Sequence, residues 1–277
     1  MISGTTTLIA HVGYPTHSFK SPLIYNPWFE KNGIDALVVP MGVKAEEYPE
    51  FFKYLFKMTN IRGALITMPH KVTTVGLVDE STPTVQIAGA ANAVLLREDG
   101  TLLGDQFDGA GFVRGVERKG FPLAGKRALV VGNGGVGSAI AASIAAAGVA
   151  ALGLFDPHKE ASEALAARID EHYPEIQIDT GSSDPEGYDI VINATPLGMN
   201  DGDPLPMDVD RISPDTFVGE VVMKQQITPF LQAARDKGCR VQVGTDMLFE
   251  QIPAYLEFFG FGTATPEALR AVSPIKG

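Results

Sequence analysis

Cysteine is almost absent from this chain, which has one, Cys239, among 277 residues. A single thiol cannot form an intrachain disulfide. Cys239 follows Lys237 and Gly238 and precedes an apolar run, which is typical of a packing role. The five histidines are scattered without the spacing of zinc ligands, so we expect no metal site. They are His11, His17, His70, His158 and His172.

Long apolar runs and an excess of positive charge are also lacking. No segment reaches about 18 consecutive apolar residues, and no basic region followed by a long apolar run opens the chain. With 22 Lys and Arg against 33 Asp and Glu, the net charge of −11 argues against nucleic-acid and membrane partners. A local basic pocket still permits an anionic substrate. We expect a soluble, cytoplasmic monomer or homodimer that binds a small molecule.

What is present is an ordinary globular composition, 45% hydrophobic and 20% charged, long enough for one large or two modest domains. Strand-like and helix-like segments alternate, which predicts an α/β fold with mainly parallel sheets. In the first part we expect strands at TLIAHVG, ALVVP and GALIT. Helices are expected over 21–31, 45–59 and 108–119, and a hairpin with a type I′ turn at Asp99-Gly100.

After the linker FPLAGK the pattern becomes a regular alternation of strands and helices. Six strand candidates follow: RALVVG, ALGLFD, IQIDT, DIVINAT, TFVGEVV and RVQVG. Helices are expected over 136–147, 159–172, 228–237, 247–259 and 266–271, and the last two could return to the first unit. The pattern predicts a Rossmann-type, doubly wound parallel sheet.

A glycine-rich stretch, residues 132–137 and called the glycine loop below, lies between an apolar strand and an alanine-rich helix. Gly132, Gly134 and Gly137 have the G-x-G-x-x-G spacing of dinucleotide sites, where glycines let the backbone approach a pyrophosphate. Asp156, at the end of the next strand, is placed to accept hydrogen bonds from ribose hydroxyls and would repel a 2′-phosphate. NAD is therefore expected in preference to NADP. No G-K-[ST] follows the glycines, which excludes P-loop chemistry.

Two residues of the first unit suit proton transfer. Oxidation of an alcohol by hydride transfer also removes the hydroxyl proton, and without a metal a Lys, His or Tyr normally accepts it. Lys71 closes ITMPHK after a strand, and Asp108 lies in GDQFDG at the crossover into the second unit. A lysine in a cleft beside an aspartate can act as the base, with the carboxylate orienting it. Read singly, each is also consistent with a solvated charge or, for Asp108, a helix N-cap.

An ordered series of motifs resembles the shikimate/quinate dehydrogenase family over nearly the whole chain. The motifs are KSP at 20–22, TMPHK at 67–71, AGAANAV at 88–94, GDQFDG at 104–109, the glycine loop, INATPLGM at 192–199, TPFL at 228–231 and the Gln251 segment. The resemblance implies an N-terminal α/β domain for a cyclic polyhydroxy carboxylate and a Rossmann domain for the nucleotide. The corresponding ranges are 1–107 completed by 245–277, and 108–244.

The same resemblance implies roles for individual residues. Lys71 would be the catalytic lysine and Asp108 its partner. The substrate would be held by short polar side chains suited to hydroxyl or carboxylate groups, on Ser21, Thr67, Asn92 and Gln251. The cofactor would be held by Gly132, Asn133, Gly134, Gly135, Val136, Gly137, Asp156, Thr195 and Gly244.

Five positions, in four segments of the chain, depart from the family pattern. Phe19 stands where a serine is usual, Leu65 where an asparagine is usual, and Met223 where a tyrosine is usual. GDQFDG, with Gln106 and Phe107, replaces GDNTDG. The departures imply retained chemistry with altered ring recognition.

Three hypotheses follow from the sequence. The first is an NAD-dependent dehydrogenase of shikimate, quinate or a close relative, giving a 3-dehydro product. The second is a specialised paralogue that uses an aminoshikimate-like ring. The third is a non-catalytic protein that binds NAD or shikimate. A methylenetetrahydrofolate dehydrogenase has a similar plan, but KSP and GDQFDG fit it poorly.

Overall fold

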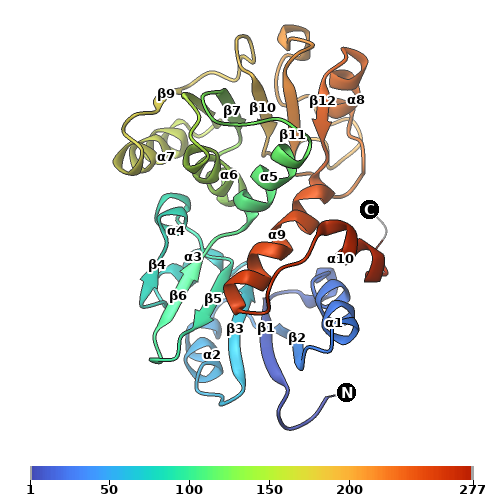
Figure 1. Cartoon of the computed structure of the whole chain (residues 1–277). Helices are drawn as coiled ribbons and strands as arrows, with labels where there is room; N and C mark the ends of the chain where they lie inside the picture. Colours follow the sequence, from blue (N-terminus) through green and yellow to red (C-terminus); the bar gives the residue numbers. More distant parts are fainter. Residues whose placement is uncertain (1, 276–277) are drawn as a thin grey trace. The chain divides into compact units, whose positions relative to one another are not determined.

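Two sheets of six strands each, separated in sequence at Phe107, organise the computed structural model, which describes residues 2–275 (Figure 1). Unit 1 contains the chain up to Phe107 and from Ile252 onward, and unit 2 contains Asp108–Gln251. The division falls inside one helix, later than the boundary expected after Gly244. In the described residues no helix is long and apolar enough to cross a membrane.

Unit 1 has a mixed sheet in the order β2-β1-β3-β5-β6-β4. β1, β2 and β3 are parallel, and β5 runs antiparallel to β3 and β6. The strands are β1 Thr7–Gly13, β2 Ala36–Gly42, β3 Ile61–Ile66, β4 Glu80–Ser81, β5 Ala93–Leu96 and β6 Leu102–Asp105. The helices are α1 Pro22–Lys31, α2 Tyr48–Leu55, α3 Lys71–Val75, α4 Pro83–Ala88 and α10 Pro266–Val272, with 3-10 turn η1 at Thr16–Ser18.

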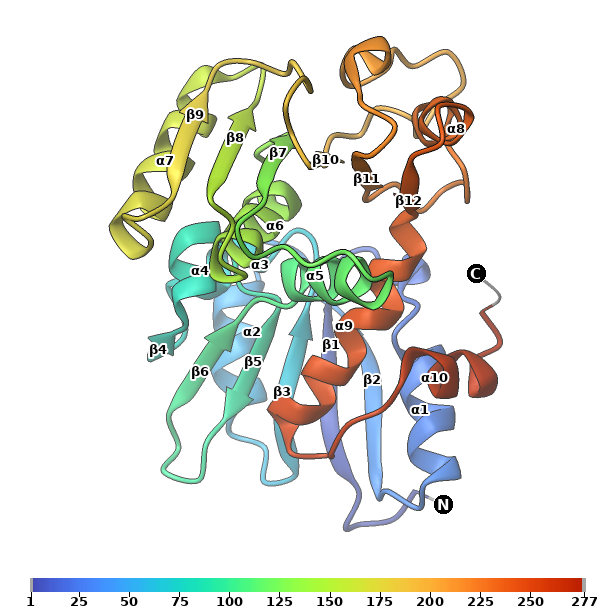
Figure 2. The same ribbon diagram turned by 45° about the horizontal axis from the view of Figure 1, so that its top comes forward.

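The two faces of this sheet are covered by different helices. Tyr48, Phe52 and Leu55 of α2 form an apolar face that packs on alternate strand residues such as Ala10 and Ala64. The end of α9 (Gly244–Phe259) covers the other face, where Phe259 lies against Gly63. Figure 2 shows these last turns of α9 in front of the sheet and α2 behind it. The unit 1 sheet is therefore covered on both faces.

Two local expectations for unit 1 are wrong. The helix expected over 45–59 is shortened to α2, which begins at Tyr48 just before Pro49 and ends at Leu55. The hairpin turn is not type I′, which needs positive φ at both central residues, because Gly100 (φ 88) has it and Asp99 does not. Asp99 instead accepts hydrogen bonds from the backbone and side chain of Thr101. The loop between β5 and β6 is therefore longer than the expected two-residue turn, since the last paired residues are Leu96 and Leu102.

Unit 2 is an entirely parallel sheet in the order β12-β11-β10-β7-β8-β9, so all six predicted strands and the α/β class are confirmed. The strands are β7 Arg127–Val131, β8 Ala151–Phe155, β9 Gln177–Thr180, β10 Ile190–Asn193, β11 Phe217–Glu220 and β12 Arg240–Gln242. The helices are α5 Asp108–Arg118, α6 Gly135–Ala146, α7 Lys159–His172 and α8 Pro229–Asp236, with a 3-10 turn η2 at Val209–Arg211.

The order of strands reverses beside β7. From β7 the chain proceeds to β8 and β9 on one side and then to β10, β11 and β12 on the other. In open parallel sheets such a reversal leaves a crevice at the carboxyl ends of the strands, where ligands bind. The glycine loop follows β7 directly, so it stands at this switch point.

Candidate functional site

The carboxyl end of β3 and the start of β5 bring two predicted substrate residues to one edge of the unit 1 sheet. The Thr67 N–H donates to the Val12 carbonyl at 2.9 Å, and the Ile66 N–H donates to the Asn92 carbonyl at 2.8 Å. Asn92 is buried, and its Oδ1 accepts the Phe107 N–H at 2.9 Å. Its Nδ2 has no hydrogen-bond partner among the described residues. Thr67 and Asn92 thus stand on backbone that the sheet itself holds.

Lys71 is the first residue of α3, immediately after this edge. Its carbonyl accepts the Ala91 N–H at 2.9 Å, which ties it to the residue before Asn92. On its other side, buried His70 stacks on Tyr48 at 3.9 Å and donates Nε2–H to the Val43 carbonyl at 2.8 Å. Burial lowers the pKa of His70, which favours the neutral ring. The lysine therefore projects from a short helix whose start is fixed by buried contacts.

Ser21 reaches the same part of unit 1 through the segment before α1. It occupies the N-cap position of α1, but its hydroxyl makes no capping hydrogen bond. Phe19, two residues earlier, packs beside Gly13, where an added Cβ would lie 3.0 Å from Phe19 Cζ and would overlap Thr67 Cγ2. The segment before α1 therefore approaches the end of β3 at Phe19, two residues before Ser21.

Two of the departures from the family pattern have packing reasons. Phe107 packs edge-to-face on Tyr255 at 4.8 Å and on Phe258 at 5.2 Å, within an aromatic cluster formed with the end of α9. Leu65 is buried in β3. Met223, in contrast, is 45% exposed.

His11 is a residue of this edge that sequence reasoning missed. It lies in β1, is 7% exposed, and stacks on Phe19 at 4.1 Å. Burial first, and the positive charge of Lys71 second, lower the pKa of His11 to about 4. The signal in the sequence that could have identified it is a histidine inside an apolar strand.

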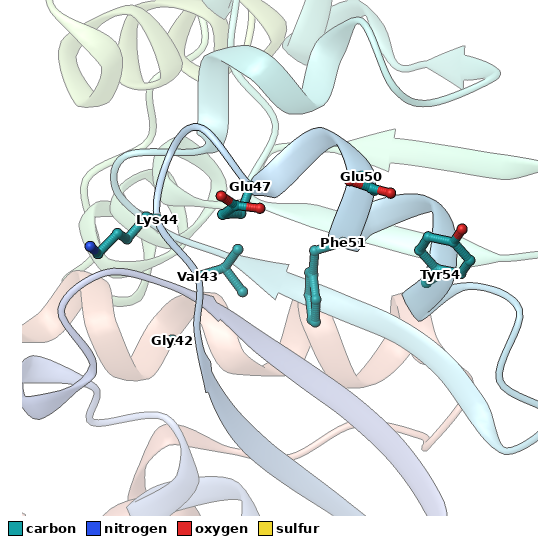
Figure 3. A pocket seen from close by; sticks show the side chains of 7 residues that line it. All are labelled: Gly42, Val43, Lys44, Glu47, Glu50, Phe51 and Tyr54. Atoms are coloured by element: carbon teal, nitrogen blue, oxygen red, sulfur yellow. The ribbon is translucent and has the colours of Figure 1, made fainter.

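A hollow of about 540 Å³ lies beyond the carboxyl end of β2. Figure 3 shows Val43, Phe51 and Tyr54 along it, with Glu47 and Glu50 at its rim and Lys44 pointing away from them. None of the predicted site residues lines it. Val43 connects it to the site only through its carbonyl contact with His70.

In unit 2 the glycine loop has the geometry that a pyrophosphate requires. Gly132 has φ 95, a conformation that L side chains rarely adopt, and a Cβ on Gly137 would overlap the Gly132 carbonyl. An added Cβ at Gly134 or Gly135 would meet nothing within 4 Å, so the outer side of the loop is open. The loop ends at the N-terminus of α6, where backbone N–H groups and the helix dipole favour an anion.

Asp156 braces this loop. One oxygen accepts the Asn133 N–H at 2.8 Å and the other accepts the His158 N–H at 2.9 Å. The side chain of Asn133 is in turn buried and accepts from Ser162 Oγ at 2.8 Å. The carboxylate is therefore held as an acceptor at the end of β8, beside the loop that it was predicted to assist.

Thr195 and Gly244 also lie at the carboxyl edge of this sheet. A Cβ on Gly132 would lie 2.8 Å from the Thr195 nitrogen, and Thr195 Oγ1 donates to Asn193 Oδ1 at 2.6 Å. A Cβ on Gly244, the first residue of α9, would overlap the Val222 carbonyl just after β11. At both places two backbone segments lie so close together that a side chain on the glycine, Gly132 or Gly244, would not fit.

Glu220 is a second residue that the sequence did not single out. It ends β11, is fully buried, and accepts Thr228 Oγ1 at 2.7 Å. Burial raises its pKa to about 7, and the Thr228 hydrogen bond opposes that shift in part. Thr228 also caps α8 by accepting the Leu231 N–H at 3.2 Å. This carboxyl links β11 to the TPFL helix.

The remaining predicted residues, Asp108 and Gln251, belong to unit 2. Asp108 is buried at the first position of α5. Gln251 lies on α9 against α5, where a Cβ on Gly111 would be 2.7 Å from Gln251 Cβ, and its Oε1 has no partner among the described residues. Lys71 belongs to unit 1, so its pairing with Asp108 stays a prediction.

Most of the predicted site residues therefore lie at the carboxyl edge of one sheet or the other, whereas Asp108 and Gln251 lie on α5 and α9. A glycine loop braced by an acidic residue at a switch point defines a dinucleotide-binding α/β protein, here joined to a second α/β unit that carries a lysine among neutral polar side chains. The chain belongs to the shikimate dehydrogenase family, as the sequence predicted.

Comparison with known proteins supports this assignment. Residues 12–94 match the family described as the shikimate dehydrogenase substrate binding domain. Shikimate dehydrogenase (NADP(+)) of Rubrobacter xylanophilus is 34% identical over 254 residues, covering 90% of this chain and 89% of the relative.

Several solved structures cover 98% of this chain, two of which are the following. Shikimate 5-dehydrogenase from Listeria monocytogenes, in complex with shikimate and NAD, has a TM-score of 0.91 with 27% identity and is covered over 97% of its length. Ligand-free 5-ketofructose reductase of Gluconobacter sp. strain CHM43 has a TM-score of 0.89 with 26% identity and is covered over 98%. Both similarities extend over the two units, which confirms the predicted two-domain plan.

Proposed function

We propose that this protein is a dehydrogenase that moves a hydride between NAD and a ring hydroxyl of shikimate, quinate or a close analogue. The observation that carries the proposal is the position of Lys71. It opens α3 at the edge that presents Thr67 and Asn92, and its carbonyl is bonded to the residue before Asn92. A ring held by these neutral groups would meet the one catalytic cation of that edge.

In this scheme the chain's own residues bind the ring and move one proton. A bound nicotinamide supplies the hydride acceptor. In the oxidising direction, Lys71 Nζ in its neutral form takes the hydroxyl proton as the C–H bond breaks, and the product is a 3-dehydro ketone. In the reducing direction the ammonium returns that proton to the forming alkoxide. Asp108 orients the lysine, while Ser21, Thr67, Asn92 and Gln251 hydrogen-bond the remaining groups.

The choice of NAD rests on Asp156. Its carboxylate accepts two backbone N–H groups at the end of β8, where an acidic side chain would repel a ribose 2′-phosphate. Lys159, the nearest cation in sequence, is paired with Glu163 at 3.0 Å. The relative from Rubrobacter is named for NADP(+), whereas the Listeria structure contains NAD. Since this family includes both, the residue at the ribose position is the better guide.

Phe19 favours a second candidate, a modified ring such as an aminoshikimate. It replaces a hydroxyl with an aromatic face beside Thr67, so one polar contact expected from the family is gone. A ring with a different substituent at that point would lose no hydrogen bond when Phe19 replaces the usual serine.

One experiment separates these functions. Steady-state kcat/KM is measured for shikimate, quinate and aminoshikimate, each with NAD and NADP. The proposal predicts highest activity with NAD and shikimate or quinate. Highest activity with aminoshikimate establishes the second candidate, and tight NAD binding by calorimetry without turnover of any ring indicates a non-catalytic binding protein. A preference for NADP overturns the interpretation of Asp156 alone.

A further inference from the structure

Several buried side-chain polar atoms have no hydrogen-bond partner among the described residues. Such an atom costs free energy, so each one calls for a physical reason. Two belong to predicted substrate residues, Asn92 Nδ2 and Gln251 Oε1, and a third is Nδ1 of His11. Tyr25 on α1, Glu220 at the end of β11 and Gln242 at the end of β12 also carry such atoms. His11 thus shares a feature with residues already assigned to the substrate.

The sheet places His11 at the same edge as Asn92. His11 in β1 is the register partner of Leu65 in β3, and Leu65 is the partner of Ala93, the residue after Asn92. Adjacent strands lie about 4.8 Å apart, so two strand spacings separate the backbones of His11 and Ala93 by about 10 Å.

Phe19 fixes the orientation of the imidazole. The two rings stack at 4.1 Å with an interplanar angle of 24°. Phe19 is itself held against Gly13, at the point where Thr67 Cγ2 also packs. The ring on which the imidazole stacks therefore lies beside Gly13, where the side chain of Thr67, another predicted substrate residue, also packs.

Charge favours a hydroxyl as the group that His11 contacts. With its pKa lowered to about 4 by burial and by the charge of Lys71, the ring is neutral near neutral pH. A neutral imidazole has one donor and one acceptor nitrogen, as a hydroxyl both donates and accepts. A carboxylate is bound most strongly by charged donors, which this ring does not supply.

The two nearest departures from the family pattern surround this ring. Phe19 and Leu65 replace a serine and an asparagine, and His11 stacks on the first and pairs in register with the second. The imidazole of His11 therefore supplies a polar group in the region where the serine and the asparagine usual in the family are replaced by the apolar side chains of Phe19 and Leu65.

We propose that His11 is a specificity-determining residue of the substrate site, whose Nδ1 hydrogen-bonds a ring hydroxyl that does not react. The inference rests on the proposed function, since it requires a ring polyol as the substrate. Phe19 acts as the positioning residue that holds the imidazole.

The test measures kcat/KM for wild type and His11→Phe on the preferred ring substrate, on its mono-deoxy analogues and on its carboxamide. The phenyl ring keeps the stack on Phe19 and removes both nitrogens. We expect His11→Phe to lose about 10- to 100-fold on the parent substrate and less than threefold on one particular deoxy analogue, because that analogue lacks the hydroxyl. The loss on the carboxamide should equal that on the parent.

A matched pair of variants tests the assignment to Nδ1. In His11→Asn the side-chain amide reaches the position of Nδ1, and in His11→Gln it reaches that of Nε2, while both lose the aromatic stack. We expect His11→Asn to retain at least tenfold more kcat/KM than His11→Gln. This pair also carries the test if His11→Phe does not fold, and melting temperatures identify which variants are folded.

Three outcomes overturn the inference. One is an equal loss on every analogue, which indicates a packing role. Another is a loss that disappears on the carboxamide, which indicates a carboxylate contact. The third is His11→Gln exceeding His11→Asn, which refutes Nδ1. Failure of wild type to turn over any ring polyol is distinguishable from these, because it refutes the proposed function before a variant is measured.

Discussion

At the scale of single residues, the proposed chemistry depends on Lys71. Its backbone is held by the Ala91 hydrogen bond and by the buried contacts of His70, so replacing its side chain should leave the edge intact. We expect Lys71→Met to lower kcat by at least about 1,000-fold, since general acid-base groups contribute about 100- to 10,000-fold. Steady-state kinetics provide the measurement.

The matched control is Lys44→Met, the same change at an exposed lysine after β2. It should keep wild-type kcat within about twofold. NAD affinity by calorimetry should be unchanged in both variants. Near-normal turnover in Lys71→Met contradicts its catalytic role.

Asp156 decides cofactor preference at the same scale. Asp156→Ala removes the anion that would repel a 2′-phosphate, and with it two hydrogen bonds to the backbone. We expect the ratio of kcat/KM for NAD over NADP to fall about 10- to 100-fold, mostly through weaker NAD binding. Asp179→Ala, at an exposed carboxylate on the neighbouring strand β9, should leave the ratio unchanged. An unchanged ratio in Asp156→Ala refutes the ribose contact.

At the scale of elements, the glycine loop depends on backbone proximity between β7 and α6. A Cβ at Gly137 would overlap the Gly132 carbonyl, whereas one at Gly135 would meet nothing within 4 Å. We expect Gly137→Ala to destabilise the protein by about 1–3 kcal/mol, the cost of overpacking, and Gly135→Ala to keep its stability. Urea unfolding without cofactor measures both, and equal stability of the two variants would contradict the close packing.

The connection from β11 to α8 should make stability depend on pH. The pKa of Glu220 is raised in the folded state to about 7 from an ordinary value of 4.5, so the folded protein binds the proton more tightly. Its contribution is complete below about pH 4.5 and is lost as the pH rises through 7. Glu220→Gln keeps an acceptor for Thr228 without the titration. The free energy of unfolding of this variant, relative to wild type, should increase from pH 5 to pH 8; a constant difference contradicts the shift.

At the scale of the whole molecule, cofactor binding should be separable from catalysis. The predicted nucleotide residues all belong to unit 2, whereas Lys71 belongs to unit 1. NAD at about 100 times its dissociation constant should stabilise the chain by about 2.7 kcal/mol. We expect Lys71→Met to keep the resulting rise in melting temperature and Asp156→Ala to lose most of it. Loss of the rise in Lys71→Met would place the nucleotide elsewhere.

Much of the architecture could be predicted because it depends on local pattern. The alternation of strand-like and helix-like segments with turn signals predicted the strands of both sheets except β4, and β1 has the bounds of TLIAHVG. Prediction failed where other interactions overrode the local pattern. Examples are α2, which is shorter than expected, and the Asp99-Gly100 turn, where Asp99 bonds to Thr101 instead. The short elements β4, α3 and α4 carried too few residues for a periodic signal.

What the sequence determined by itself was the family, the glycine loop and the order of its motifs, since a motif is local and its spacing is carried along the chain. What only the tertiary structure decided was the environment of single side chains. In the sequence Phe19 indicates only the loss of a serine hydroxyl, whereas the structure shows that its ring stacks on His11. His11 and Leu65 are neighbours only because β1 and β3 are paired. Burial and charge at such positions arise from residues distant in sequence, and so they depend on the folded chain.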